Sequence, residues 1–318
     1  MAELRFELTD IDDGTVDVDN ILSYELSMDV DAPCHGLRLY FTHSRALAEL
    51  YSIRVFTDSK CIFNGYVDTQ RETVNDDGIT CFVYARSSAC LLVDNQAKPF
   101  NYSHPCTQAL YVLNAKEYGF TNRLPNIACD GNYLVTAGKS CWAAINDFVY
   151  GMTGNGIFVT ADNCIVPARQ GKKSAISPHS IVSARRVINR GDVISAIDYK
   201  NGDSRDYINH YRSNFFCSRR IRCTKKQNLG AFPDWQKNYI LHNQLTQAGD
   251  DYMTYQLRLA EVWQGNLWDT VELQLGYFGR TGVLEVSSIR YSMDKSGVST
   301  VVTLRRSIDM EEIDYVAE

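Results

Sequence analysis

Two spacings of hydrophobic residues divide this chain into three successive blocks. In residues 36–41 and 79–86, as in most of the first 95 residues, every second residue is apolar. From about residue 96 the apolar residues follow helical spacing around short strands, and alternation returns after Pro178. Alternation indicates strands with one buried face, whereas three-to-four-residue spacing indicates amphipathic helices. The sequence therefore predicts an α+β protein, mainly β, with an α/β domain inserted between two β domains.

Turn-forming residues lie between the predicted strands. Asp77-Gly78 supplies the positive φ angles of a tight hairpin turn, and Asn201-Gly202 does the same further along the chain. Hairpins are accordingly predicted for the strand pairs 61–68 and 79–86, 156–160 and 164–166, 193–199 and 207–211, and 283–291 and 299–305.

Three helices are predicted in and just before the middle block. Serine N-caps precede the first and the third, and glycine, which favours the left-handed position after a helix, follows the second and the third. Residues 250–268 are rich in aromatic residues without a consistent period, so no element is predicted there. The helices are expected at 87–94 (N-cap Ser87 or Ser88), 107–118 (followed by Gly119) and 140–150 (N-cap Ser140, followed by Gly151).

A length of 318 residues is enough for two or three domains. The changes of spacing place the domain boundaries near residues 95 and 180. An alternative is that 181–225 completes the first β domain. The expected domains are a first β domain at 1–95, an α/β insert at 96–180 and a second β domain at 181–308, followed by an acidic tail at 309–318.

Charge is distributed unevenly along the sequence. The net charge of −6 combines an acidic start with a basic centre: residues 1–31 hold ten carboxylates and one arginine, and residues 167–226 hold fourteen Lys or Arg and four acidic residues. The last twelve residues contain five carboxylates and no basic residue. Such runs are either solvated faces or surfaces that dock on a partner of opposite charge.

The basic centre provides the candidate interface residues. Direct nucleic-acid recognition is the weaker alternative, because the total charge is negative and a basic strand end explains the same residues. The expected protein interface consists of Arg185, Arg186, Arg190, Arg219, Arg220, Arg222, Lys225 and Lys226.

Ten cysteines are scattered singly through the chain, unlike the dense frameworks of small secreted domains. No apolar run approaches the roughly 20 residues of a membrane-spanning helix. The N-terminus lacks the basic start and apolar stretch of a signal peptide. We therefore expect reduced cysteines and synthesis in a cytoplasm.

Two motifs at a helix start resemble functional sequences but lack residues that the chemistry needs. Residues 137–140 (Ala-Gly-Lys-Ser) follow a strand, as a phosphate-binding loop does, yet Tyr133 stands where the first glycine is required. Residues 140–142 (Ser-Cys-Trp) resemble the nucleophile segment of papain-like proteases, yet Val135 and Gly138 replace its glutamine and its earlier cysteine. A plain helix cap and a buried Cys-Trp pair are therefore favoured.

Metal and cofactor chemistry have no consistent pattern in this sequence. Residues 10–14 resemble a calcium loop, but Thr9 and Ile11 occupy two of its leading ligand positions. No Cys-x-x-Cys pair occurs, and the six histidines are dispersed. Carboxylate pairs for glycoside hydrolysis depend on separation in space, which a sequence does not define. We predict no catalytic, cofactor-binding or metal-binding residues and a protein that is not an enzyme.

A succession of short motifs resembles the tail hub proteins of contractile bacteriophages, the Mu-like and defective-prophage hub family that R-type bacteriocins also use. The motifs are degenerate, but their order and the total length are consistent, and they touch most of residues 55–306. They lie at 63–68 (Phe-Asn-Gly-Tyr-Val-Asp), 77–78, 80–85, 89–102, 116–120, 142–148, 157–160, 207–209, 289–297 and 300–304.

This resemblance implies a structural homotrimer. Its two β domains would be β-barrels that form a pseudo-sixfold ring, which joins the sixfold tail tube to the threefold central spike. The implied partners are other copies of the chain, the tail tube protein, the central spike protein and other baseplate proteins. Neither a membrane nor sequence-specific nucleic acid is implied, and the implied location is the baseplate of a virion or tail-like particle. The alternative function is a cell-wall-targeting hydrolase or a carbohydrate-binding tail module.

Overall fold

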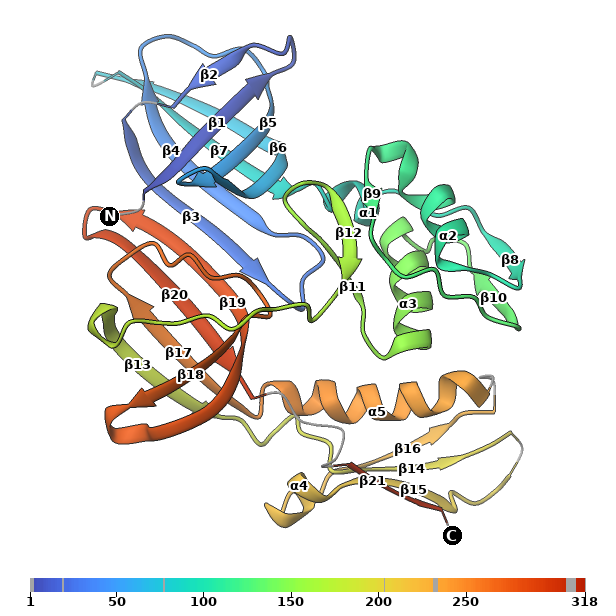
Figure 1. Cartoon of the computed structure of the whole chain (residues 1–318). Helices are drawn as coiled ribbons and strands as arrows, with labels where there is room; N and C mark the ends of the chain where they lie inside the picture. The colour runs from blue at the N-terminus through green and yellow to red at the C-terminus, as the bar shows by residue number, and fades with distance from the viewer. Residues whose placement is uncertain are drawn as a thin grey trace.

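The computed structural model contains one antiparallel sheet that runs through both β-rich parts of the chain (Figure 1). Its strands follow the order β13-β17-β20-β19-β3-β4-β7-β6-β5-β1-β2, with β18 paired to β19. Because β3 hydrogen-bonds to β19, strands from the start and the end of the chain share this sheet. The structure describes residues 3–18, 20–76, 78–202, 204–230, 234–306 and 313–317.

The N-terminal β unit comprises residues 4–87. Alternate residues of its strands point into the core, as period two predicts, and Leu37 and Leu39 of β4 are fully buried. The hairpin predicted around Gly78 is confirmed by the pairing of β6 with β7, although Asp77 lies outside the described residues. The strands are β1 (Leu4–Asp10), β2 (Thr15–Asp17), β3 (Ile21–Asp29), β4 (Gly36–His43), β5 (Leu50–Thr57), β6 (Lys60–Asn75) and β7 (Gly78–Ser87).

The C-terminal β unit consists of β13 and β17 to β20. The hairpin predicted for 283–291 and 299–305 is confirmed by the pairing of β19 with β20. Strand β17 lies in the stretch to which the sequence assigned no element, and it pairs with β20 and with the edge strand β13. The elements are β13 (Ile181–Ile188), β17 (Met253–Leu259), β18 (Thr270–Leu275), the 3-10 helix η3 (Gly276–Phe278), β19 (Gly279–Asp294) and β20 (Gly297–Arg305).

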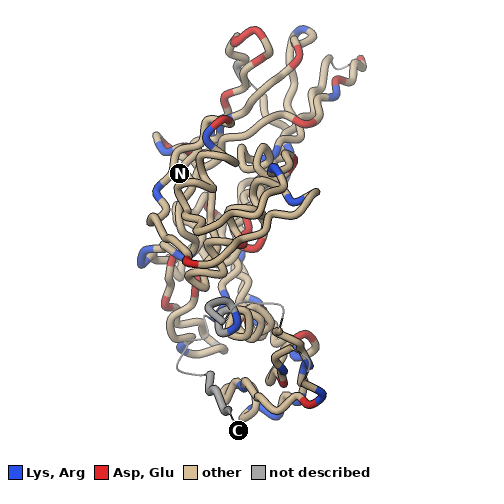
Figure 2. Tube along the Cα trace, turned by 90° about the vertical axis from the view of Figure 1, so that its right-hand side faces the viewer, with Lys and Arg blue, Asp and Glu red and all other residues tan. Residues whose placement is uncertain are grey.

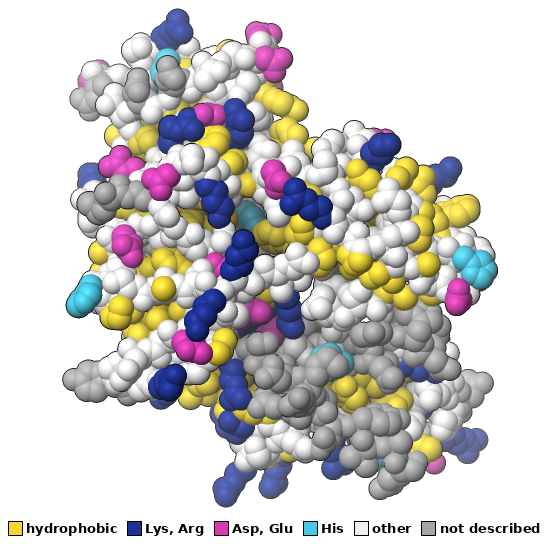
Figure 3. Space-filling view, viewed as in Figure 1, with side chains coloured by type: hydrophobic (Ala, Val, Ile, Leu, Met, Phe, Trp, Pro, Cys, Tyr) yellow, Lys and Arg dark blue, Asp and Glu magenta, His cyan; other side chains and the backbone are white. Residues whose placement is uncertain are grey.

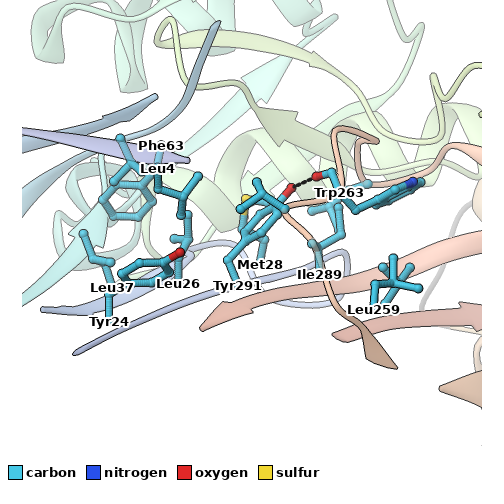
Figure 4. Packing of buried hydrophobic residues seen from close by; sticks show 14 of the residues in the cluster. Leu4, Tyr24, Leu26, Met28, Leu37, Phe63, Leu259, Trp263, Ile289 and Tyr291 are labelled. Carbon is cyan, nitrogen blue, oxygen red and sulfur yellow. Dashed lines mark hydrogen bonds between the residues drawn. The ribbon is translucent and has the colours of Figure 1, made fainter. Parts of the chain in front are cut away.

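One hydrophobic core continues across the two β units. Leu26 and Leu37 of the N-terminal unit and Ile289 and Tyr291 of the C-terminal unit are all buried and lie along the same row of side chains (Figure 4). The Tyr291 hydroxyl donates a hydrogen bond of 2.8 Å to the carbonyl oxygen of Trp263, which satisfies a polar group inside this core. Side chains as well as backbone hydrogen bonds therefore join the two units.

An α/β insert lies beside the N-terminal β unit (Figure 1). It has a separate core around Ile145 and Phe148 of α3. The hairpin predicted for 156–160 and 164–166 is confirmed by the pairing of β11 with β12. The elements are α1 (Cys90–Asp94), β8 (Phe100–Ser103), α2 (Thr107–Asn114), the 3-10 helix η1 (Lys116–Tyr118), β9 (Thr121–Asn122), β10 (Asn132–Val135), α3 (Cys141–Thr153), β11 (Ile157–Val159) and β12 (Cys164–Pro167).

The helix ends of the insert agree with the sequence in part. Ser140 caps α3 as predicted, because its Oγ accepts a hydrogen bond of 3.1 Å from the backbone N–H of Ala143. The helix predicted at 107–118 is divided: α2 ends at Asn114 with Ala115 as its C-cap, and Gly119, at φ 81°, ends the 3-10 helix η1 that follows. The predicted end of α3 before Gly151 is wrong: the helix continues through this buried glycine, and Gly154, at φ 74°, takes the left-handed position.

The predicted N-cap of the first helix is also wrong. Helix α1 begins at Cys90 and its N-cap is Ala89, which makes no side-chain cap. Ser87 is the last residue of β7, and its Oγ accepts a hydrogen bond of 3.0 Å from the backbone N–H of His35. The Ser87 hydroxyl is therefore engaged across the sheet rather than at the helix.

A C-terminal α/β unit lies below the C-terminal β unit in Figure 1. The hairpin predicted around Asn201-Gly202 is confirmed by the pairing of β14 with β15. Helix α5, which the sequence did not predict, buries Leu241 and Leu245 in one cluster with Ile197 and Tyr199 of β14. The elements are β14 (Ala196–Lys200), β15 (Asn209–Ser213), α4 (Asn214–Ser218), β16 (Thr224–Asn228) and α5 (Asp234–Asp250), and the 3-10 helix η2 (Pro178–Ser180) precedes β13.

The last strand, β21 (Ile313–Ala317), pairs with β15 in this unit. Part of the predicted acidic tail thus belongs to the sheet β16-β14-β15-β21, while residues 309–312 and 318 lie outside the described residues. The predicted domain 181–308 covers both the C-terminal β unit and most of the α/β unit, and the domain bounds stay predictions. No helix in the described part of the chain is long and apolar enough to cross a membrane.

Candidate functional site: a basic face and a charged junction

The basic residues of the predicted interface gather toward the lower end of the molecule. Figure 1 shows β13, α4 and β16 in this region, and Figure 3 shows basic side chains projecting from it. Arg185 and Arg186 lie on the edge strand β13, with the Arg186 guanidinium 5.1 Å from the centre of the Phe278 ring. Arg190 donates a hydrogen bond of 2.9 Å to the carbonyl oxygen of Arg219, which links the segment after β13 to the end of α4.

Arg219 has a structural role in this region. Its guanidinium carbon lies 3.3 Å from the centre of the Phe215 ring, and its Nη1 donates a hydrogen bond of 2.9 Å to the Phe215 carbonyl oxygen. These contacts hold the side chain against α4. The remaining four predicted residues are exposed and form no ion pair with any described residue. We call them the basic face: Arg220, Arg222, Lys225 and Lys226.

Part of the acidic start of the chain lies at the opposite end. The turn between β1 and β2 is at the top of Figure 1 and of Figure 2, which share a vertical axis. Within it, Asp10 Oδ1 accepts hydrogen bonds from the backbone N–H groups of Gly14, at 2.7 Å, and Asp12, at 3.0 Å. The carboxylate thus closes a turn rather than a calcium loop, and this acidic turn lies at the other end of the molecule from the basic face.

A buried arginine joins separate parts of the fold. Arg305, at the end of β20, is 1% exposed, and its guanidinium nitrogens lie 3.1 Å from Asp31, 3.3 Å from Asp250 and 3.3 Å from Glu285 carboxylate oxygens. Arg169, just after the insert, adds a second cation 3.5 Å from Asp250. We call these five residues the charged junction, because they come from both β units, the end of α5 and the chain leaving the insert.

Burial controls the electrostatics of the charged junction. It raises the pKa of Asp250 to about 6, although the neighbouring Arg305 and Arg169 guanidinium groups favour the ionised form. Trp268 covers both cations, with its ring centre 5.3 Å from Arg305 and 5.7 Å from Arg169. Removing one charged side chain from this buried group leaves its partners unpaired. The junction therefore stabilises the packing of the units within the chain only when all of its charged side chains are present.

The motifs at the start of α3 are engaged in structural contacts. Lys139 Nζ lies 2.7 Å from an Asp147 carboxylate oxygen and donates a hydrogen bond of 3.2 Å to the Tyr133 hydroxyl. Cys141 is buried, and burial raises the pKa of its thiol, whereas a nucleophilic cysteine needs a lowered pKa. Over the described ranges, no group of three or more His, Cys, Asp or Glu is placed to hold a metal ion.

Solved structures place this arrangement in the fold class of bacteriophage tail proteins. The tail protein from Neisseria meningitidis MC58 is 14% identical, with a TM-score of 0.75, over 95% of this chain and 96% of that one. The 43 kDa tail protein of prophage MuSo2 from Shewanella oneidensis is 13% identical, with a TM-score of 0.79, over 98% of this chain and 100% of that one. At these identities the likeness shows a shared fold.

The same fold extends to a secretion system. The Escherichia coli c3393 protein is a component of the type VI secretion system with structural similarity to the T4 bacteriophage tail proteins gp27 and gp5. It is 8% identical to this chain, with a TM-score of 0.62, over 99% of this chain and 79% of that one. No protein-family model matches the sequence, and no curated protein matches it. The resemblance to phage tail proteins is therefore confirmed at the level of the fold.

Proposed function

We propose that this chain is a structural, non-enzymatic subunit of the baseplate hub of a contractile phage tail or a tail-like bacteriocin. The observation that carries the proposal is a fold shared along almost the full length of two tail proteins. Two further observations support a structural role: Lys139 in the first catalytic-looking motif is ion-paired with Asp147, and burial raises the pKa of the Cys141 thiol in the second. Its location would be the baseplate of the particle.

The continuous sheet supports a ring built from repeated β units. Pairing of β3 with β19 already sets the N-terminal and C-terminal β units side by side within one chain. Strands β2 and β13 are the two edges of the sheet path, and an edge strand presents unpaired backbone groups. We propose that three chains place six barrel-like β units in a pseudo-sixfold ring, which adapts the sixfold tail tube to the threefold central spike.

A basic face at one end and an acidic turn at the other suit a ring that stacks between unlike partners. Contacts of the basic face with an acidic partner would help to fix the order and the orientation of stacking. We propose that the basic face contacts the tail tube protein, a neighbouring hub subunit or the lumen, and that the spike and other baseplate proteins are further partners.

Charge reversal tests the basic face. Arg219 is left unchanged, because its side chain packs on Phe215. We expect few or no assembled particles by electron microscopy when the basic face is reversed, and normal numbers for a control that reverses exposed basic residues elsewhere. Normal assembly of the first variant would refute this interface. The test variant is Arg220→Glu, Arg222→Glu and Lys225→Glu, and the control is Arg45→Glu, Lys98→Glu and Lys116→Glu.

Locating the labelled chain in purified particles tests the hub itself. A label at the centre of the baseplate, with a mass of three chains by light scattering after assembly, supports the proposal. A label at the fibre tips would favour a carbohydrate-binding module, and degradation of cell walls by the isolated chain would favour a hydrolase. Either of these results contradicts a hub.

A further inference from the structure

A cavity of about 950 Å³ lies where the N-terminal β unit, the insert and the C-terminal β unit meet. Figure 3 shows this hollow between the N-terminal unit and the insert, with a histidine at its floor. Residues of β6, of β11 and of the loop before β18 line it. Its volume is at the upper end of the roughly 300–1,000 Å³ that ligand pockets occupy.

Two buried polar atoms of the lining have no hydrogen-bond partner in the described part of the chain. They are Nδ1 of His35 and Nε1 of Trp268. His35 is only 7% exposed, and burial lowers the pKa of its imidazole to about 4, so the ring is neutral at pH 7. The indole N–H of Trp268 can only donate. Both atoms have almost no accessible surface of their own, so they form part of the packed wall behind the cavity and are not contact points for an occupant.

The cavity walls also contain aromatic surface. The His35 ring lies 5.6 Å from the ring of Phe158, and both residues line the cavity together with Phe63. Phe63 is almost fully buried, whereas Phe158 is half-buried. Such a wall favours a ligand with a bulky apolar group, since burying that group removes apolar area from water.

Positive charge exceeds negative charge around the cavity, where four basic side chains face two acidic ones. Arg123 and Lys172 are exposed and form no ion pair with any described residue. Of the acidic residues, Asp269 is engaged, because its carboxylate accepts hydrogen bonds from the backbone N–H of Lys172 and the hydroxyl of Ser174. Asp162 is exposed and accepts a hydrogen bond from the Thr160 hydroxyl. Arg123 and Lys172 thus leave an excess of positive charge at the rim, which favours a ligand with carboxylate groups.

An edge strand at the wall favours a polypeptide over a small molecule. Strand β11 is at one edge of the sheet β11-β12-β9, and its residues Phe158 and Val159 line the cavity. Asn146 of α3 already accepts a hydrogen bond of 3.0 Å from the backbone N–H of Ile157, so the edge is open only toward Val159. An extended peptide can align with such an edge and place alternate side chains in pockets. The occupant thus combines an extended backbone, an apolar anchor and acidic side chains.

We propose that this cavity binds an extended acidic segment of another protein, with its apolar side chain against Phe158 and its carboxylates at Arg123 and Lys172. Binding of a peptide by the isolated chain does not depend on the tail role. The assignment of the segment to another protein of the particle rests on the proposed function.

Selection of a random displayed peptide library on the full chain tests the ligand class. We expect enriched peptides in which acidic residues flank a large apolar one. They should bind the Arg123→Glu and Lys172→Glu double variant about tenfold more weakly than the unsubstituted chain. The matched control, Arg45→Glu with Lys98→Glu, should bind them unchanged. Enrichment of basic or uncharged peptides, or no enrichment, overturns the proposal.

His35→Phe separates binding from stability. Phenylalanine keeps a ring against Phe158 and removes the unpaired nitrogen, so thermal unfolding should occur at the same or a higher temperature. Because this nitrogen is not accessible from the cavity, peptide affinity should stay within about twofold of that of the unsubstituted chain. Undiminished binding by the charge-reversed variant would place the peptide elsewhere and overturn the proposal.

A photoreactive residue in place of Lys60, which also lines the cavity, locates the occupant in assembled particles. Cross-linking to an acidic segment of a tail component supports both the cavity and the tail role. Cross-linking to a basic segment or to a lipid overturns the cavity proposal. Selective peptide binding by a chain that never enters particles would contradict the tail role alone.

Discussion

Replacement of Arg305 by methionine should strongly destabilise the chain, because it removes a cation from buried carboxylates. Asp250 and Glu285 are 8% and 11% exposed at their side chains, and both would lose a partner at 3.3 Å. The Asp31 side chain is 64% exposed, so solvent screens its ion pair with Arg305 and this pair contributes little to the free energy of unfolding. Breaking a buried pair costs about 3–5 kcal/mol, and Arg169, which remains 3.5 Å from Asp250, favours the lower part of that range, about 3–4 kcal/mol.

The size of this loss should depend on pH in a defined direction. Burial raises the pKa of Asp250 from 3.8 to about 6, so between these values the folded chain binds a proton that the unfolded chain has released. The contribution of Asp250 to stability therefore falls as the pH rises from about 4 to about 6. Without Arg305 the folded pKa rises further, so the loss caused by Arg305→Met should be larger near neutral pH than under acidic conditions.

Guanidinium unfolding, followed by circular dichroism and tryptophan fluorescence, measures this loss at about pH 5 and about pH 7.5. Arg290→Met is the matched control, because Arg290 is exposed on β19 and forms no ion pair with the described residues. The control should change the free energy of unfolding by less than about 0.5 kcal/mol. A loss below about 1 kcal/mol for Arg305→Met at neutral pH, or an equal loss at both pH values, would refute the reasoning.

Three further substitutions probe the local structure. Ser140→Ala removes the α3 cap and should lower the free energy of unfolding by about 1 kcal/mol in urea; no change would mean that the cap is not formed. Gly65→Ala would place a Cβ 2.2 Å from the Arg86 carbonyl oxygen and should lower the free energy of unfolding by about 1–3 kcal/mol. The control Gly191→Ala, where the new Cβ has room, should leave it nearly unchanged. Phe148→Ala should cost about 3–5 kcal/mol and speed hydrogen exchange chiefly in the insert, and uniform exchange would contradict its separate core.

Strands and hairpins were predictable because their signals are local. Alternating burial follows directly from alternating hydrophobicity, as at Leu37 and Leu39, and the turns at Gly78 and Gly202 have residues suited to positive φ. The cap at Ser140 is equally local, since Oγ and its donor are three residues apart.

Helix α5 and strand β21 were missed because local signals are weak or misleading there. In α5 only a narrow apolar stripe, which includes Leu241 and Leu245, is buried, and the polar residues Asn243, Thr246 and Asp250 are buried beside it. The acidic composition of the C-terminus suggested a solvated tail, whereas its pairing with β15 joins segments about a hundred residues apart. Hydrophobic periodicity detects neither the burial of polar residues in α5 nor the pairing of β21 with a distant strand.

The candidate site was predictable only in its charge. Clustered bases indicated the basic face, but a cluster gives no sign that Arg219 is held by Phe215. The charged junction and the cavity combine residues from distant segments, such as Asp31 with Arg305 and His35 with Trp268. For the charged junction, the available sequence signal was the position of Arg305, a charged residue at the end of an apolar strand.

The pairing of β3 with β19 has a consequence for synthesis on the ribosome. Partners in this pairing are more than 250 residues apart in sequence, so β3 has no partner on that side until nearly the whole chain has been translated. At about 5–20 residues per second, the interval is on the order of 10–50 s. During this time the exposed edge of β3 can template pairing with another nascent chain. Translation speed and chaperone supply, rather than equilibrium stability, should therefore limit the yield of correctly folded protein.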